Sequence, residues 1–303
     1  MRYHFHTCDV FTDSVFGGNP LAVFPDGRGL DDGQMQRIAR EFNLSETVFV
    51  LPPDDAAHTR RLRIFTPARE LPFAGHPTVG TAHVLAAIGD VALQGDETRI
   101  VFEEGVGPVP VTIRAQGGAP VFAQLTAAQP PEVGPPPPAD DVIAAALGLE
   151  AADLGAGDMA AQAVSCGTPF LFVPVRDPAA VERIALDTGR WRAAFADYWT
   201  SALFVFAMGG ERPGSDISAR MFSPLWGIPE DPATGAAATA LGGYLALRDR
   251  RGDARLAWTV EQGFAMGRPS IIEVEADKRG GQVAELRVGG ASVMVSEGDF
   301  DVP

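Results

Sequence analysis

The hydrophobic and polar positions in the first half of the chain follow mostly the period of β-strands, with one amphipathic helix among them. The helix is predicted over residues 30–43, where four apolar residues fall at positions i, i+3, i+4 and i+7: Met35, Ile38, Ala39 and Phe42. Strands rich in β-branched and aromatic residues are predicted at 2–11, 21–24, 44–51 and 58–67, and a hairpin at 97–115. This half therefore predicts a β-rich unit.

A proline-rich stretch, QPPEVGPPPPADD at 129–141, separates this half from the rest of the chain. Dense prolines exclude helix and central strand and favour an extended linker. A length of 303 residues also suits two domains. We expect an N-terminal domain of residues 1–128, joined by the C-terminal segment 285–303, and a second domain of residues 129–284.

The second half predicts a similar mixture of helices and strands. Helices are expected at 141–149 and around 181–192, strands at 169–175 and 202–208, and β-hairpin material at 270–300.

Two segments, one in each half, resemble each other. IFTPARELPFAGHPTVGTAHVLAA at 64–87 matches MFSPLWGIPEDPATGAAATALGGYLA at 221–246 when His76 is aligned with Asp231. Each copy predicts a strand, a turn and a helix that begins with proline, which is favoured at the first helical position. This interpretation makes His76 and Asp231 the N-cap residues of two related helices, and it indicates an internal duplication.

Both predicted helices lack charged side chains, with none at 71–89 and none at 232–247. A helix without charge on any face is buried on all sides. We therefore predict an α+β fold of two similar domains, each a β-barrel wrapped around a central helix, with the active site in the cleft between them. A doubly wound parallel sheet does not fit this pattern.

The charge balance limits the partners. With 24 Lys and Arg against 39 Asp and Glu, the formal net charge is −15, which disfavours nucleic acid and anionic membranes. A small anionic substrate then needs local positive potential. Two helix N-termini, with their unpaired N–H groups and positive dipole ends, predict a pocket for an anion such as a carboxylate.

The location expected from the sequence is the cytoplasm. Cys8 and Cys166 lie far apart in no metal-like spacing and fit buried, reduced thiols. The first residues are too polar for a signal peptide, and no apolar stretch is long enough for a membrane span.

Three residues are candidates for proton chemistry, and each has a structural alternative. Asp is a common N-cap, so Asp231 alone could serve only to start a helix, and the same holds less strongly for His76. Glu46, in NLSETVFV, could be an ordinary glutamate of an edge strand. If it is buried in the cleft, it is prepared for general acid/base work near neutral pH.

Four motifs in order carry a resemblance to a known family: DVFTDSVFGGNPLAVF, NLSETVFV, ELPFAGHPTVGTAHVL and GIPEDPATGAAATALGGYL. Together they resemble the PhzF-like isomerases of phenazine biosynthesis. The resemblance implies a fold similar to diaminopimelate epimerase, a homodimer, and no metal or organic cofactor.

By motif, the resemblance implies that Glu46 is the general acid/base and that His76 and Asp231 are its substrate-binding and proton-handling partners. It assigns the backbone N–H groups that hold a substrate carboxylate to the two helix starts, at Gly75, Thr234, Gly235 and Ala236. Family members often carry Ser where this chain has Ala236. A hydroxyl contact is lost there, so we expect the substrate to differ.

The function expected from the sequence is a cofactor-independent isomerase that moves a proton on a small carboxylate. Alternatives are an epimerase or a lyase on the same scaffold, or a non-catalytic small-molecule-binding protein. The epimerase relatives use two facing cysteines, and neither cysteine of this chain lies in a helix-start motif.

Overall fold

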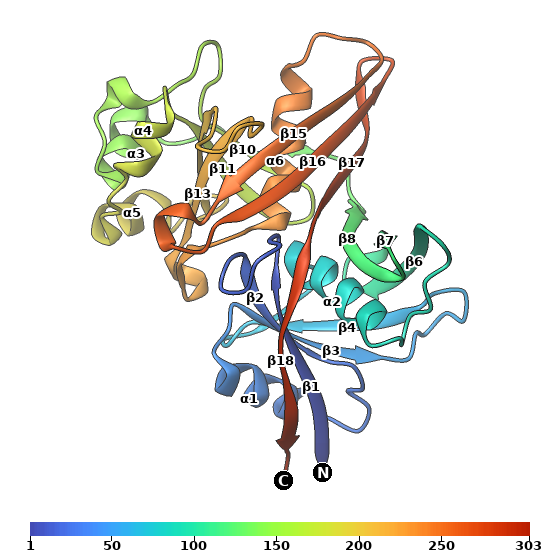
Figure 1. Cartoon of the computed structure of the whole chain (residues 1–303). Helices are drawn as coiled ribbons and strands as arrows, with labels where there is room; N and C mark the ends of the chain where they lie inside the picture. Colours follow the sequence, from blue (N-terminus) through green and yellow to red (C-terminus); the bar gives the residue numbers. More distant parts are fainter. The chain divides into compact units, whose positions relative to one another are not determined.

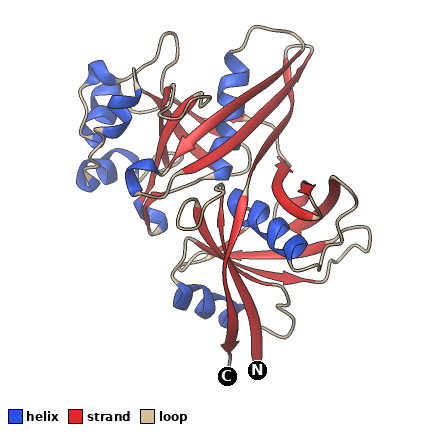
Figure 2. Cartoon of the chain, viewed as in Figure 1, coloured by secondary structure: helices blue, strands red, loops and turns tan.

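The computed structural model describes residues 1–303 and divides into two compact units. The first comprises Met1–Ala128 and Arg287–Pro303, and the second comprises Gln129–Leu286. Strands predominate in both units, with a few helices beside them (Figure 1 and Figure 2). The predicted α+β class is confirmed.

The first unit begins and ends with strands. Its helices are α1 (Asp32–Phe42) and α2 (Gly75–Ala87). Its strands are β1 (Arg2–Val10), β2 (Asn19–Phe24), β3 (Glu46–Leu51), β4 (Arg60–Phe65), β5 (Glu70–Leu71), β6 (Glu97–Glu104), β7 (Gly107–Gln116), β8 (Ala119–Thr126) and β18 (Ser292–Asp301), with the end of β17 (Gln282–Gly290).

These strands form one curved sheet in the order β18–β1–β2–β3–β4–β6–β7–β8–β17. The pairs β2–β3 and β4–β6 are parallel and the others antiparallel, and the short β5 pairs with β4. Helix α2 contacts β1, β2, β3, β7, β8 and β18, which places it at the centre of the curve (Figure 1). The sheet therefore wraps around a central helix, as predicted.

The burial of α2 follows from its composition. Every residue from Gly75 to Ala86 is buried, and the helix has no acidic residue in its first turn and no basic residue in its last. Helix α1 behaves differently: its buried residues lie on one face and a capping box between Asp31 and Gln34 starts it. Only the helix with no polar face is enclosed by the sheet.

The second unit has more helices on its outside. Its helices are α3 (Asp140–Leu147), α4 (Pro178–Glu182), α5 (Thr188–Phe195) and α6 (Gly235–Arg248), with the 3₁₀ turns η1 (Ala151–Asp153), η2 (Pro224–Trp226) and η3 (Phe264–Met266). Its strands are β9 (Glu132–Val133), β10 (Gln162–Ser165), β11 (Pro169–Pro174), β12 (Leu203–Met208), β13 (Ile217–Ser223), β14 (Ile228–Asp231), β15 (Ala254–Gln262) and β16 (Ser270–Arg279), with the start of β17.

The strand pairing of the first unit is repeated in the second. The pairs β10–β11, β12–β13, β13–β14 and β15–β16 are antiparallel, as are β1–β2, β3–β4, β4–β5 and β6–β7. The parallel pairs β11–β12 and β13–β15 correspond to β2–β3 and β4–β6. Helix α6, buried over most of its length, contacts β10, β11, β15 and β16 and corresponds to α2. The two units are thus copies of one topology.

The predicted N-caps are wrong. Helix α2 begins at Gly75 with Ala74 as N-cap, so His76 is its second residue and Pro77 its third. Helix α6 begins at Gly235 with Thr234 as N-cap, and Asp231 is the last residue of β14. Pro77 lies within the first turn of α2, where its missing N–H has no helical partner, whereas Pro232 precedes the N-cap of α6, so proline did not mark the first helical position. By position in the helix, the counterpart of His76 is Ala236.

One other prediction needs correction. The helix expected around residues 181–192 is two helices, α4 and α5, because the Asp187 carboxylate accepts hydrogen bonds from Gly189 N–H and Arg190 N–H and starts the second one. The proline-rich stretch contains the two-residue strand β9, which pairs with β10 alone and is therefore not a central strand.

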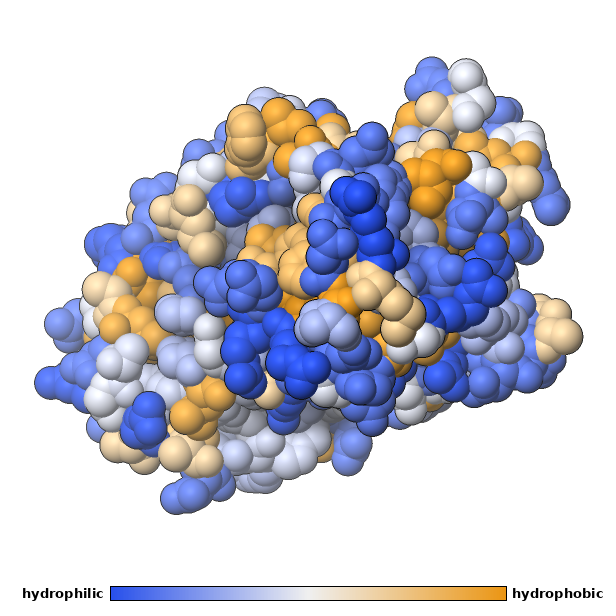
Figure 3. All heavy atoms as spheres, turned by 90° about the horizontal axis from the view of Figure 1, so that it is seen from below, coloured by the Kyte–Doolittle hydropathy of each residue, from blue (hydrophilic) through white to orange (hydrophobic).

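The surface carries both hydrophilic and hydrophobic residues. The face drawn in Figure 3 is largely hydrophilic, with smaller hydrophobic areas between. No helix in the structure combines the length and the apolar character that a membrane span needs.

Close packing of α2 at Gly80 gives a first prediction. A Cβ atom at Gly80 would lie 2.5 Å from Val10 Cγ2 and 2.7 Å from Leu21 Cδ2. We expect Gly80→Val to lower the free energy of unfolding by about 1–3 kcal/mol, because a tightly packed core does not accept the added volume. Urea unfolding measures this. The control is Gly252→Val, since no atom lies within 4 Å of a Cβ at Gly252; equal losses in both variants would contradict the packing argument.

Candidate active site

Three polar side chains meet beside the start of α2 in the first unit. Glu46 begins β3, Asn19 begins β2 and His76 is the second residue of α2. His76 Nε2 lies 3.2 Å from Glu46 Oε2, and His76 Nδ1 lies 3.3 Å from Asn19 Nδ2. All three side chains are buried.

Glu46 is not on an edge strand, so the structural alternative for it is wrong. Strand β3 lies between β2 and β4, and Glu46 is opposite Leu21 in the parallel pair. The residue is 7% exposed. Its carboxylate is therefore held at the inner end of a central strand.

The proton of His76 has a defined place. Burial lowers the pKa of His76 to about 3, so the ring is neutral at neutral pH. The amide nitrogen of Asn19 can only donate, so Nδ1 is the acceptor and the ring hydrogen sits on Nε2. Nε2 lies 3.2 Å from Glu46 Oε2, although the two atoms do not meet hydrogen-bond geometry in this structure. A small rotation of either side chain would let this N–H stabilise the Glu46 carboxylate without charging the histidine.

The N-terminus of α2 adds positive potential to the same place. Its N-cap, Ala74, provides no side-chain hydrogen bond to the helix. Pro77 has no N–H, so Gly75 and His76 are the first-turn residues whose N–H groups lie outside the helical hydrogen-bond pattern. Such a helix start is suited to an anion.

In the second unit, Asp231 belongs to a hydrogen-bonded turn before α6. Thr234 Oγ1 donates to Asp231 Oδ2 at 2.5 Å. Gln262, on β15, donates to the carbonyl oxygen of Asp231 and accepts from Thr234 N–H. Thr234 does not cap α6 with its side chain, and the next residues are Gly235, which is buried, and Ala236, which is half-buried. The predicted residues Asp231, Thr234, Gly235 and Ala236 thus form one local group.

Sequence reasoning missed two residues that orient these groups, Asn19 and Gln262. Asn19 lies in GGNP, which reads as a simple turn, and Gln262 ends an ordinary strand. Both are almost completely buried amides. A buried amide needs hydrogen-bond partners, but only the folded chain shows that these partners are His76 and the Asp231 turn.

A second carboxyl group lies under the first turn of α2. Glu104 ends β6, and its Oε1 lies 2.6 Å from Thr78 Oγ1, which is also 2.8 Å from the carbonyl oxygen of Ala74. Burial raises the pKa of Glu104 to about 8, and the hydrogen bond with Thr78 opposes the rise only in part. Glu104 is therefore mainly protonated at neutral pH and supports the helix start as a neutral acid.

The two cysteines are not prepared to act as nucleophiles. Cys8 and Cys166 are buried and free. Burial raises the pKa of both thiols above the usual range, that of Cys166 to about 12.

Comparison with known proteins identifies the family of the chain. The family model described as phenazine biosynthesis-like protein matches residues 8–298. The chain belongs to this family. An uncharacterized isomerase from Mesorhizobium japonicum is 42% identical, with 96% of each chain covered. Trans-2,3-dihydro-3-hydroxyanthranilate isomerase from Pseudomonas aeruginosa is 36% identical, again with 96% of each chain covered.

Solved structures show the same fold. The phenazine biosynthesis protein of the PhzF family from Bacillus anthracis superimposes with a TM-score of 0.88, at 25% identity and with 100% of both chains covered. A hydroxyproline epimerase from Agrobacterium vitis, 14% identical, shares the fold with a TM-score of 0.69 over 98% of this chain and 92% of its own. The predicted family, fold and enzyme class, an isomerase, are confirmed.

Glu104 gives the second prediction. A folded-state pKa near 8 against an ordinary value near 4.5 means that the folded protein keeps a proton that the unfolded chain loses. The free energy of unfolding should then fall as pH rises from about 4.5 to about 8, by on the order of a few kcal/mol. We expect Glu104→Gln to remove this decline, as measured by urea unfolding at pH 5 and pH 8.5.

The control for this variant is Glu97→Gln, which changes an exposed glutamate of the same strand. It should keep the wild-type pH dependence. If Glu104→Gln and wild type show parallel profiles, Glu104 is not protonated in the folded state.

Proposed function

We propose that this isomerase moves a proton on a small carboxylate substrate by general acid/base catalysis, with Glu46 as the acid/base. The observation that supports this most is the buried Glu46 carboxylate, 3.2 Å from the Nε2 of a neutral His76 at the start of an uncapped helix. One place thus offers a base, a hydrogen-bond donor and a potential that attracts anions.

In the proposed reaction, Glu46 removes a proton from a carbon that adjacent unsaturation makes acidic, and it returns the proton to another carbon on the same face. The N–H of His76 stabilises the carboxylate form of Glu46 and orients it. Because the histidine stays neutral, the proton remains on Glu46 until it is returned to the substrate. Assistance of this kind contributes about 10²–10⁴-fold to a rate.

The substrate carboxylate is assigned to the backbone N–H groups at the helix starts. This supplies the local positive potential that a chain with a net charge of −15 needs for an anionic ligand. In the second unit, binding of the substrate carboxylate is assigned to the backbone N–H groups of Thr234, Gly235 and Ala236. Asp231 is assigned the role of the second proton-handling group. The prediction that both helix starts serve one active site stays a prediction.

The relative from Pseudomonas aeruginosa is named for trans-2,3-dihydro-3-hydroxyanthranilate, a carboxylate with unsaturation beside a carbon that bears hydrogen. We propose that this chain acts on a compound of the same chemical class. Ala236 cannot donate a side-chain hydrogen bond, so the substrate should lack the group that a serine would contact. A homodimer, the assembly that the family resemblance implies, is part of the proposal.

Epimerisation by two thiols is the less favoured alternative, because Cys8 and Cys166 are buried with raised pKa values. Incubation in deuterium oxide separates the two reactions. Isomerisation moves a double bond in the product, whereas epimerisation only inverts a centre.

Glu46→Gln provides the third prediction. We expect kcat to fall by about 10²–10⁴-fold, because the amide cannot accept the proton, while ligand binding changes little. A thermal-shift screen of small carboxylates, including the dihydrohydroxyanthranilate, identifies ligands, and NMR of proton exchange measures turnover. The control is Glu41→Gln, an exposed glutamate of α1. Unchanged turnover in Glu46→Gln would refute the assignment.

Asn19→Asp provides the fourth prediction. An aspartate here accepts a hydrogen bond from Nδ1 of His76, which moves the ring hydrogen away from Nε2 and from Glu46. We expect kcat to fall at least roughly tenfold with little change in KM, since Asn19 orients His76 and a wrong tautomer is costly in catalysis. A merely structural role would instead lower the melting temperature and leave kcat per folded enzyme unchanged.

A further inference from the structure

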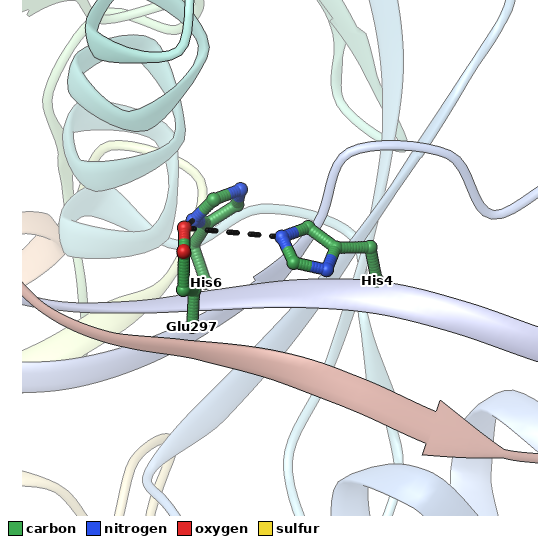
Figure 4. A group of neighbouring side chains, drawn as sticks. All are labelled: His4, His6 and Glu297. Atoms are coloured by element: carbon green, nitrogen blue, oxygen red, sulfur yellow. Dashed lines mark ion pairs between the residues drawn. The ribbon is translucent and has the colours of Figure 1, made fainter.

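Two histidines and a glutamate converge on one face of the sheet in the first unit, on strands β1 and β18. Their ligand atoms all lie within 4.8 Å of one another (Figure 4). His6 is opposite Glu297 and His4 is opposite Asp299 in the antiparallel pair β1–β18. Alternate residues of a strand share a face, so the register places all four side chains together.

The distances suit a small metal ion. Glu297 Oε2 lies 3.5 Å from His6 Nδ1 and 3.9 Å from His4 Nε2. Bonds of about 2.0–2.2 Å to a tetrahedral Zn²⁺ place the ligand atoms roughly 3.3–3.6 Å apart. Modest side-chain rotations of His4 and Glu297, which are largely exposed, would bring the three atoms to these separations.

His6 supplies an independent indication of a ligand. Its side chain is only 7% exposed, and its Nδ1 is buried without a hydrogen-bond partner although it points at the cluster (Figure 4). A buried polar atom without a partner costs free energy, and a bound cation would satisfy it. The contact of 3.5 Å with Glu297 Oε2 does not meet hydrogen-bond geometry, so it leaves Nδ1 unsatisfied.

Asp299 prepares His4 for the same role. Asp299 Oδ1 lies 3.1 Å from His4 Nδ1, so this nitrogen carries the hydrogen and the lone pair of Nε2 is directed at Glu297. Arg2 in turn lies 3.2 Å from Asp299 Oδ2. Histidines that bind metals are oriented in this way by a carboxylate at their other nitrogen.

We propose that His4, His6 and Glu297 form a binding site for a divalent transition metal ion, with Zn²⁺ the best match to two imidazoles and one carboxylate. The remaining position is open to water. The ion joins β1 to β18, the first and last strands of the unit, and stabilises their pairing. The site is separate from Glu46 and His76 and does not depend on the proposed reaction.

The test uses full-length protein without a histidine tag, freed of metal by a chelator and titrated with ZnCl₂ by calorimetry. We expect one Zn²⁺ per chain and a melting temperature that rises with zinc concentration. Mg²⁺, which prefers oxygen ligands, should produce no shift.

The side chains of His4 and Glu297 are largely exposed. The variants His4→Gln and Glu297→Gln should therefore fold normally, so a loss of zinc binding can be assigned to the lost ligand. Each should weaken zinc binding at least tenfold, and Asp299→Asn should weaken it less. The control is His58→Gln, because His58 pairs with Glu103 at 2.8 Å but has no second histidine beside it. The proposal is overturned if wild type does not bind zinc, or if the affinity survives in both His4→Gln and Glu297→Gln.

Discussion

A helix without charged side chains has to be covered on every face. In this protein the sheet of each unit wraps around one such helix. Helix α2 has neither a polar face nor a side-chain cap, so the strands around it bury everything from Gly75 to Ala86. Glycines allow this, since Gly80 leaves no space between the helix and β1 and β2. The same constraint recurs at α6, where Gly242 faces Val274 and Gly243 faces Pro131.

The burial of α2 sets the protonation states of the side chains at its N-terminus. Because the first turn of α2 is removed from water, His76 is held neutral and Glu104 is held largely protonated, while Glu46 is placed against the histidine. A helix start in solvent would leave these groups near their ordinary behaviour. The N–H groups of the first turn of α2 stay suited to bind an anion for the same reason. The N-cap Ala74 provides no side-chain hydrogen bond to them, and the first turn is buried.

The face of the sheet that packs against α2 also carries polar side chains. On β1, Cys8 and Val10 lie against Gly80 of α2. His4 and His6 lie on the same face nearer the start of the strand, where they meet carboxylates of β18 across the strand pair. One face of a strand thus serves packing along one part and polar chemistry along another.

The sequence by itself determined the fold class, the family and the existence of two related halves, because charge-free helices, alternating strands and motifs are local patterns. It also pointed to Glu46, His76 and Asp231, whose catalytic roles stay predictions. It placed the repeat in the wrong register, since Pro77 lies inside the first turn of α2 and Pro232 lies before the N-cap of α6, so the two prolines do not mark equivalent positions. Only the tertiary structure decided that Asn19 orients His76, that Gln262 holds the turn of Asp231 and that His4, His6 and Glu297 meet. These contacts join residues far apart in the chain, and their distances depend on strand register and burial, which no local pattern records.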